Sequence, residues 1–306
     1  MAEKSKKRGE FGEEIVERLL TLIGWDTLLK GRDFACIKPI PHAISTRGRT
    51  THGIDFIYQY DCPLFNNNQE FVLVSSKFND SYPSNPVSKF KLHLQDIAQA
   101  LDCFKKSDIR NELKSPQKTA KYTGVIFWLD NGEQNQYDDV IDRLSDFRVD
   151  NDLEFDSVYL VDNNRADFLY DTISYVTDRF ENMEVEFYIP STGYNNTIQA
   201  RRTSSPILPV QYINSSILPF KVVQDVSTEI LILNVIDNFE RDHLTRLISL
   251  AQKLTEGWAN KIFILFPEFN ENLQGEVVEN VKSEFRDQDF VRKVEINTFH
   301  PDFRNA

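Results

Sequence analysis

The stretch GIDFIYQYDCPLFNNNQEFVLVSSKF, residues 53–78, decides the fold. It begins with IDFIYQY at 54–60, whose β-branched and aromatic side chains favour a strand. The residues CPLFNNNQ at 62–69 predict a turn, and EFVLVSSKF at 70–78 predicts a second strand. Because the second strand is apolar on both faces, we expect it in the centre of a sheet.

The flanking sequence supplies further helices and strands, read from apolar stripes and turn signals. They are an amphipathic helix at 9–23, a short strand at 34–40, a loop or hairpin tip at 44–53, a helix at 89–106 and a buried strand at 121–131. This alternation of strands and helices is typical of an α/β fold.

Three polar residues stand out in the two apolar strands. Asp55 lies near the start of the first strand, and Ser75 and Lys77 share one face of the second because side chains alternate along a strand. A lysine late in an apolar strand is costly to bury without an anionic partner. In the simplest interpretation, Asp55 is that partner and the two form a structural ion pair.

The order of these residues resembles that of a known superfamily. Gly9 to Glu13 in the first helix, then Gly53-Ile54-Asp55-Phe56, then Ser75-Ser76-Lys77-Phe78 resemble the motifs of PD-(D/E)XK, restriction-endonuclease-like nucleases. The resemblance covers about residues 8–130 and implies an αββαβ core with a mixed sheet. More loosely, the set resembles nuclease-like subunits of bacterial anti-phage defence systems.

The resemblance implies phosphodiester hydrolysis with a divalent cation, Mg²⁺ or Mn²⁺. Carboxylate oxygens hold such hard cations, which polarise the phosphate and stabilise the leaving oxygen. In this chain Asp55 would be the central metal ligand, Glu13 the acid from the first helix and Lys77 the catalytic lysine. The alternative for Glu13, which borders the apolar face of its helix, is a solvent-exposed helix acid.

The chain departs from the family pattern two residues before the lysine, where Ser75 replaces the usual Asp or Glu. A serine cannot replace a carboxylate as a charged ligand. In one interpretation the missing acid comes from the following helix, as in a branch of restriction enzymes with an S-x-K motif, and Asp96 is the candidate for this metal ligand. In the other, the site is inactive and the fold binds nucleic acid or a partner.

Basic residues around the motifs are candidates for binding a phosphate backbone. They are Arg47 and Arg49 in the loop, His52 before Gly53, and Lys89 and Lys91 at the start of the second helix. The alternative is a solvated basic surface.

The charge of the chain is unevenly distributed. All 306 residues carry 35 Lys and Arg against 47 Asp and Glu, a net charge of −12, which on its own argues against a nucleic-acid partner. Residues 1–118, however, carry 18 basic and 15 acidic residues, and the remainder carries 17 against 32. The first third could therefore face a polyanion while the acidic remainder meets solvent or a protein with a basic surface; two solvated surfaces of different sign are the alternative.

Other sequence features restrict the class of protein. Cys36, Cys62 and Cys103 have no CxxC spacing and the histidines are scattered, so neither a disulfide scaffold nor a cysteine-rich zinc site is expected. No apolar run is long enough to cross a membrane, and the basic start has no apolar core after it as a signal peptide would. We therefore expect a cytoplasmic protein that does not bind membranes.

The remainder of the chain predicts two further parts. The nuclease domain is expected to occupy 1–190, with a helix at 136–146 and with strands at 157–162 and 184–189 extending its sheet. A Pro/Ser/Asn-rich linker or extended arm would follow at 191–220, then a small α/β accessory domain at 221–306.

These observations predict a metal-dependent nuclease acting on DNA, with RNA as the alternative substrate. The expected context is an anti-phage complex with a second protein subunit or a second copy of the chain. The rival hypothesis is a catalytically inactive nuclease-fold subunit that binds nucleic acid or a partner protein.

Overall fold

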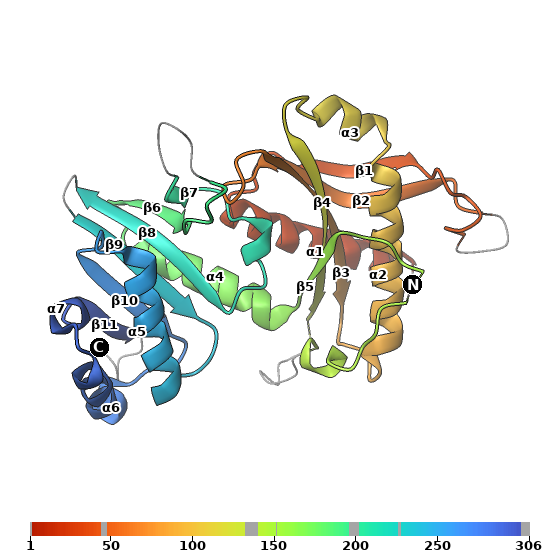
Figure 1. The fold of residues 1–306 in the computed structure, drawn as a ribbon. Coiled ribbons are helices and arrows are strands. Elements are labelled where there is room, and N and C mark those ends of the chain that lie inside the picture. Colours follow the sequence, from red (N-terminus) through yellow and green to blue (C-terminus); the bar gives the residue numbers. More distant parts are fainter. Residues whose placement is uncertain are drawn as a thin grey trace. The chain divides into compact units, whose positions relative to one another are not determined.

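The computed structural model describes residues 2–43, 48–131, 140–150, 152–195, 202–225 and 228–300, with side chains from residue 7 onward. The chain divides into two units, Met1–Asp167 and Phe168–Ala306 (Figure 1).

A five-stranded mixed sheet forms the centre of the first unit. Its strands are β1 (Leu29–Ala35), β2 (Thr51–Asp61), β3 (Asn68–Asn79), β4 (Thr119–Asp130) and β5 (Ser157–Val161), in that spatial order. β1, β2 and β3 pair antiparallel, whereas β3, β4 and β5 pair parallel. The central position of β3 and the mixed sheet confirm the predicted architecture.

Helices pack against this sheet from both sides. The helices and turns of the unit are α1 (Ala2–Leu22), α2 (Pro86–Phe104), α3 (Asp108–Leu113), the 3₁₀ turn η1 (Asp142–Leu144) and the start of α4 (Asn163–Arg179). Trp25, just after α1, stacks on Tyr58 of β2, whereas the neighbouring Ile57 joins the core cluster formed with α2. Because adjacent strand residues point to opposite faces, α1 and α2 cover different faces of the sheet.

The second unit contains a six-stranded sheet of its own. Its elements are β6 (Glu184–Tyr188), β7 (Ser204–Ser205), η2 (Val210–Tyr212), β8 (Ile217–Asp225), β9 (Thr228–Val235), α5 (Arg241–Thr255), β10 (Lys261–Phe266), α6 (Glu271–Glu284), α7 (Gln288–Val291) and β11 (Val294–Thr298). The spatial order is β11-β10-β9-β8-β6-β7, with β9, β10 and β11 parallel. The second unit therefore combines helices with a mixed sheet.

The boundary between the units differs from the predicted one. β6 pairs with β8 in the second sheet and does not extend the first, so the first unit ends at Asp167 and not near 190. The stretch expected as a linker at 191–220 contains β7, η2 and the fully buried Leu208. The stretch was predicted as a linker because most of its residues are polar, but a few apolar residues in it are buried in the core.

Two further expectations concern individual segments. Of the helix predicted at 136–146, residues 136–139 lie outside the described residues, and 140–146 contain the 3₁₀ turn η1 in place of an α-helix. Within the described ranges, no helix is both long enough and apolar enough to cross a bilayer.

Candidate active site

Asp55 is fixed where β2 and β3 stop pairing. The register of the two strands runs as far as the pair Phe56 and Val74. Immediately beyond it, the backbone N–H of Ser76 donates a hydrogen bond of 2.6 Å to Oδ2 of Asp55. This bond orients the half-buried carboxylate at the end of the strand pair and leaves its other oxygen, Oδ1, for a ligand.

Gly12 brings α1 close to the same end of β3. A Cβ at Gly12 would lie 2.4 Å from Cβ of Phe78, a separation that real Cβ atoms do not tolerate. The neighbouring Phe11 ring meets the Phe78 ring edge-on at 5.4 Å. Because Phe78 directly follows Lys77, this close approach carries Glu13 to the Asp55–Lys77 end of the sheet.

The charges of Glu13, Asp55 and Lys77 influence one another. Burial raises the pKa of Glu13 above its usual value, and the nearby carboxylate of Asp55 raises it further. Lys77 acts in the opposite direction and lowers the pKa of Glu13. The structure thus brings together the three residues to which the sequence assigned the central ligand, the helix acid and the lysine.

Lys77 does not form a structural ion pair within the described residues. In the part of the chain that the structure describes, no ion pair or hydrogen bond joins the Lys77 side chain to Asp55 or to another residue. The simple structural pair considered from the sequence is therefore wrong. A half-buried ammonium without a close counter-ion remains able to meet an anionic ligand.

Ser75 is buried, with 6% of its surface exposed, on β3 two residues before Lys77. Its hydroxyl adds no charge to the site. Glu13 and Asp55 are accordingly the two predicted metal ligands that the electrostatics of the described residues couple, and a bound cation would relieve their repulsion, to which Glu10 adds. Oxygen donors of this kind fit a hard divalent cation such as Mg²⁺ or Mn²⁺.

Asp96, the predicted third acid, has a different partner. Its Oδ1 lies 2.7 Å from Nη1 of Arg49, and Nε of Arg49 also donates a 2.9 Å hydrogen bond to the carbonyl of Thr51. The Arg49 side chain is only 12% exposed. The two residues predicted for metal and phosphate binding therefore neutralise each other, and both of those roles stay predictions.

The remaining basic candidates for phosphate binding differ in their partners and exposure. Lys91 forms an ion pair with Asp150 at 2.8 Å, whereas Lys89 is exposed and influences the neighbouring His93. Arg47 lies outside the described residues. Of the two lysines at the start of α2, Lys91 is therefore paired with a carboxylate, whereas the charge of Lys89 acts on His93.

His52 is not at a phosphate-binding surface, which corrects the sequence prediction. Its side chain is completely buried, and burial lowers its pKa to about 4. Both ring nitrogens lack a hydrogen-bond partner. A buried neutral imidazole cannot contact a nucleic-acid backbone, so its role must lie inside the fold.

His93 is a buried residue close enough to Lys77 to feel its charge, and the sequence interpretation gave it no role at the candidate site. It lies on α2 with its ring edge-on to Trp128 at 5.4 Å, and its buried Nε2 has no hydrogen-bond partner. Burial lowers the pKa of His93 to about 4, and Lys77 contributes in the same direction. The helical spacing of His93 from Lys89 and Asp96 was the only available signal, and it is common among core histidines.

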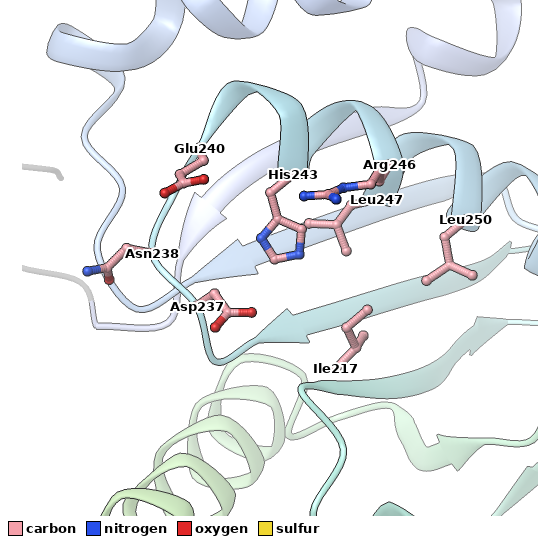
Figure 2. A pocket seen from close by; sticks show the side chains of 8 residues that line it. All are labelled: Ile217, Asp237, Asn238, Glu240, His243, Arg246, Leu247 and Leu250. Carbon is pink, nitrogen blue, oxygen red and sulfur yellow. The ribbon is translucent and has the colours of Figure 1, made fainter. Parts of the chain in front are cut away.

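The second unit offers a separate pocket of about 520 Å³. It lies where β9 leads into α5, next to the carboxyl ends of the parallel strands, a frequent ligand position in α/β sheets. Its lining carries acidic Asp237 and Glu240 together with basic His243 and Arg246 (Figure 2). This mixed lining favours no particular ligand chemistry, so the first unit remains the better candidate.

A comparison with known protein families identifies the first unit. The family model described as the GAPS4 protein PD-(D/E)XK nuclease domain matches residues 1–165, nearly the whole of the first unit. Searches of curated proteins and of solved structures found no match.

Proposed function

The chain belongs to the GAPS4 family of PD-(D/E)XK nuclease domains, and from this premise we propose that it is a metal-dependent nuclease that cleaves DNA. The observation that carries the proposal is the convergence of Glu13, Asp55 and Lys77 at one end of β3. RNA is the alternative substrate. The biological role we propose is defence against phage.

Glu13 and Asp55 would hold the cation, Mg²⁺ or Mn²⁺. Bound there, the cation would polarise the scissile phosphate and stabilise the leaving oxygen. Asp55 is suited to this because the Ser76 N–H fixes its carboxylate before any ligand arrives. Lys77 then meets the negative charge that develops on the phosphoryl oxygens, where a preorganised ammonium is most effective.

Substrate approach is supported by the charge of this part of the chain. Residues 1–118 have a small basic excess, and Lys89 lies on α2 near the site. We propose that the acidic remainder contacts a second protein subunit or a second copy of the chain, because it would repel phosphates. The proposed location is the cytoplasm.

The rival function is a catalytically inactive subunit that binds nucleic acid or a partner. Two observations favour it: Ser75 occupies the position of the usual acid, and Asp96 is paired with Arg49. With only two coupled carboxylates, the fold could bind a phosphate backbone without cleaving it.

The decisive experiment compares cleavage by the wild type, Asp55→Asn and Lys77→Met on labelled DNA and RNA, with Mg²⁺ or Mn²⁺. We expect wild-type cleavage of DNA and a loss of roughly 10²–10⁴-fold in each variant. Asp61→Asn is the matched control, since Asp61 lies on the same strand and pairs with Lys118 away from the site. Binding without cleavage under every condition would favour the rival function.

A further inference from the structure

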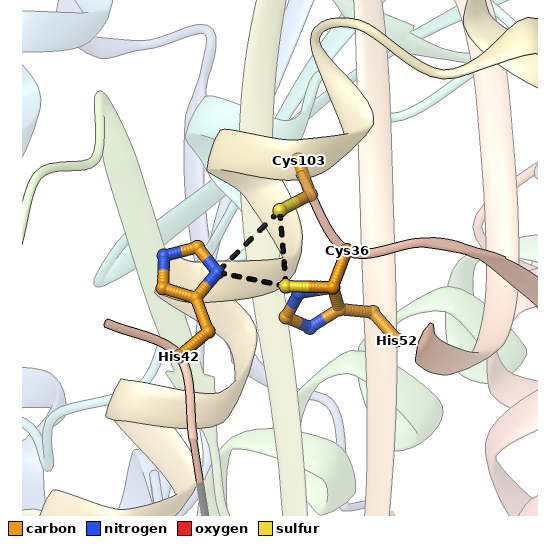
Figure 3. A group of neighbouring side chains, drawn as sticks. All are labelled: Cys36, His42, His52 and Cys103. Carbon is orange, nitrogen blue, oxygen red and sulfur yellow. Dashed lines mark hydrogen bonds between the residues drawn. The ribbon is translucent and has the colours of Figure 1, made fainter. Parts of the chain in front are cut away.

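Four metal-ligating side chains meet inside the first unit, away from the carboxylate site. Cys36 directly follows β1, His42 lies in the connection to β2, His52 is on β2 and Cys103 is on α2 (Figure 3). All four are buried, and one ligand atom from each lies within 4.8 Å of all the others. The fold thus assembles a compact set of two sulfurs and two imidazoles from segments distant in sequence.

The spacing of the two sulfurs and the His42 nitrogen matches one face of a tetrahedral metal centre. The two sulfurs are 3.9 Å apart, and Nδ1 of His42 lies 3.5 Å from the Cys36 sulfur and 3.4 Å from the Cys103 sulfur. Bonds of about 2.3 Å to sulfur and about 2.0–2.1 Å to nitrogen place tetrahedral ligands about 3.8 Å apart for two sulfurs and about 3.6 Å apart for sulfur and nitrogen. The observed edges agree with these values to within a few tenths of an ångström.

His52 provides a second, independent indication. Both of its ring nitrogens are buried without a hydrogen-bond partner. Leaving a buried polar group unpaired is costly, and such groups call for a specific explanation, of which a bound ion is one. Its ring contacts those of Phe34, at 5.8 Å, and His42, at 5.4 Å, so its nearest polar ring belongs to the cluster.

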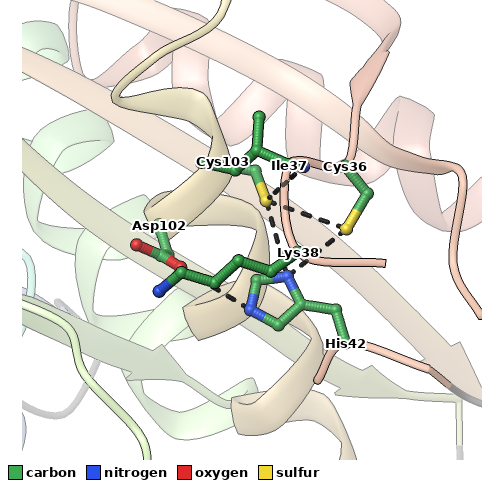
Figure 4. Close-up of polar contacts among 6 residues, drawn as sticks. All are labelled: Cys36, Ile37, Lys38, His42, Asp102 and Cys103. Atoms are coloured by element: carbon green, nitrogen blue, oxygen red, sulfur yellow. Dashed lines mark hydrogen bonds and ion pairs between the residues drawn. The ribbon is translucent and has the colours of Figure 1, made fainter. Parts of the chain in front are cut away.

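The surroundings of the cluster resemble those of metal-bound ligands. The backbone N–H of Ile37 donates to the Cys103 sulfur at 3.4 Å, an interaction that favours a thiolate (Figure 4). On the other side of the His42 ring, Nε2 faces the Asp102 carboxylate at 3.6 Å, and Lys38 holds that carboxylate at 2.7 Å. A carboxylate behind a ligating histidine commonly fixes its ring orientation.

We propose that Cys36, His42, His52 and Cys103 bind a structural Zn²⁺ ion that ties the β1–β2 connection to α2. Two thiolates and two neutral imidazoles favour zinc over Mg²⁺ or Ca²⁺, which prefer oxygen ligands. All four coordination positions come from the protein, so the centre has no open position for catalysis. On binding, both thiols lose their protons to solvent, and the two thiolates balance the charge of the ion.

The site has a route to solvent. A pocket of about 440 Å³ is lined by His42, Lys38 and Asp102 on one side of the cluster. Zinc or a chelator could therefore reach His42 without global unfolding. The ion would anchor the segment that carries Arg49 and so stabilise this region of the nuclease domain.

The alternative to a metal ion is a disulfide bond between Cys36 and Cys103. Their sulfurs are close, but at 3.9 Å they are well beyond the roughly 2.05 Å of an S–S bond, and both cysteines are free thiols here. A disulfide would also leave both histidines without a role. Mass spectrometry of the purified protein distinguishes the two, because a disulfide removes two hydrogens and binds no metal.

The test is the metal content of the full chain, purified without a histidine tag and measured by inductively coupled plasma mass spectrometry. We expect about one zinc per chain in the wild type and nearly none in Cys103→Ala or His52→Ala. Cys62→Ala is the matched control, because Cys62 is also a buried free cysteine but lies outside the cluster. It should keep full zinc content.

A second measurement covers variants that fail to fold. The wild type is stripped with a zinc chelator and titrated with Co²⁺, which should give intense tetrahedral absorption and thiolate charge-transfer bands that added Zn²⁺ abolishes and Mg²⁺ does not. A wild type that holds no zinc after reconstitution and gives no such bands overturns the proposal, as does an intact Cys36–Cys103 disulfide. No readout depends on nuclease activity, so the result is independent of the proposed function.

Discussion

The carboxylate site and the cysteine–histidine cluster lie in the same unit but differ in exposure, in donor atoms and in assembly. Glu13 on α1 and Asp55 on β2 are only partly shielded from solvent, whereas all four cluster residues are buried. The first site offers oxygen donors to an exchangeable cation and a substrate, and the second offers sulfur and nitrogen with every position filled. One unit can therefore use two metals for different purposes if access and donor type keep them apart.

The largest expected effect is that the two metals act on different properties: Mg²⁺ or Mn²⁺ on cleavage, and Zn²⁺ on thermal stability. Omitting Mg²⁺ and Mn²⁺ should abolish cleavage and leave the melting temperature almost unchanged. Removing zinc with a sulfur- and nitrogen-selective chelator should lower the melting temperature by roughly 5–15 °C. Differential scanning fluorimetry and a cleavage assay on the same samples measure both effects.

Restoration provides the control for this separation. Added Zn²⁺ should recover the melting temperature without replacing Mg²⁺ in the cleavage assay, and added Mg²⁺ should do the reverse. Equal recovery of both properties by either metal would contradict the distinction between the sites.

The contact between α1 and β3 gives the next effect. Gly12→Ala should reduce the free energy of unfolding by about 1–3 kcal/mol and impair cleavage, because the new Cβ would overlap Cβ of Phe78 and displace Glu13. Chemical denaturation and cleavage rates measure the two consequences.

Gly9→Ala is a matched control on the same helix. A Cβ at Gly9 has open space around it, so this change should stabilise the helix by about 0.5–1 kcal/mol and leave cleavage intact. If both variants shift stability in the same direction, the close approach at Gly12 does not position Glu13.

The two sites also differ in how much of them the sequence could predict. Asp55 and Lys77 lie on neighbouring strands whose order and alternation are local properties, so their convergence followed from the strands at 54–60 and 70–78. Cys36 and Cys103 are 67 residues apart, and they meet only because α2 packs over the β1–β2 connection. No spacing rule for zinc ligands within one short segment could identify such a pair.

Tertiary packing explains the other differences. The strand β6 is short and partly apolar, as β5 is, and nothing in its sequence indicates which of two sheets it joins. Asp96 was a reasonable metal ligand from its place on the helix after the lysine, but Arg49, from a loop 47 positions earlier in the sequence, reaches it in the fold.

The acid dependence of stability tests the buried environment of His93. Its pKa is about 4 in the folded protein and should return to about 6.5 on unfolding. As pH falls from 6.5 towards 4 the unfolded chain binds the proton first, so the free energy of unfolding should decrease by up to about 1.4 kcal/mol per pH unit for this histidine. The contribution is fully present above pH 6.5.

His93→Gln should make the pH dependence measurably shallower, as followed by chemical denaturation at several pH values. The slope is the readout, because the loss of contact with Trp128 lowers stability at every pH. Identical slopes in both proteins would mean that His93 is protonated equally well in the folded and unfolded chains.

The smallest effect concerns Asp96 and decides whether it compensates for Ser75. As a partner of Arg49, Asp96 should contribute about 0.2–1 kcal/mol to stability, because one member of the pair is more than a third exposed. Asp96→Asn and Arg49→Gln should then cause similar small losses of stability, and the double variant should lose less than their sum.

Cleavage should persist in all three variants, since Glu13 and Asp55 are the carboxylates that would hold the cation. If Asp96→Asn abolishes cleavage and Arg49→Gln does not, Asp96 leaves its ion pair to serve as the third metal ligand. The carboxylate site would then be completed only when cation and substrate bind, whereas the cysteine–histidine cluster is already assembled.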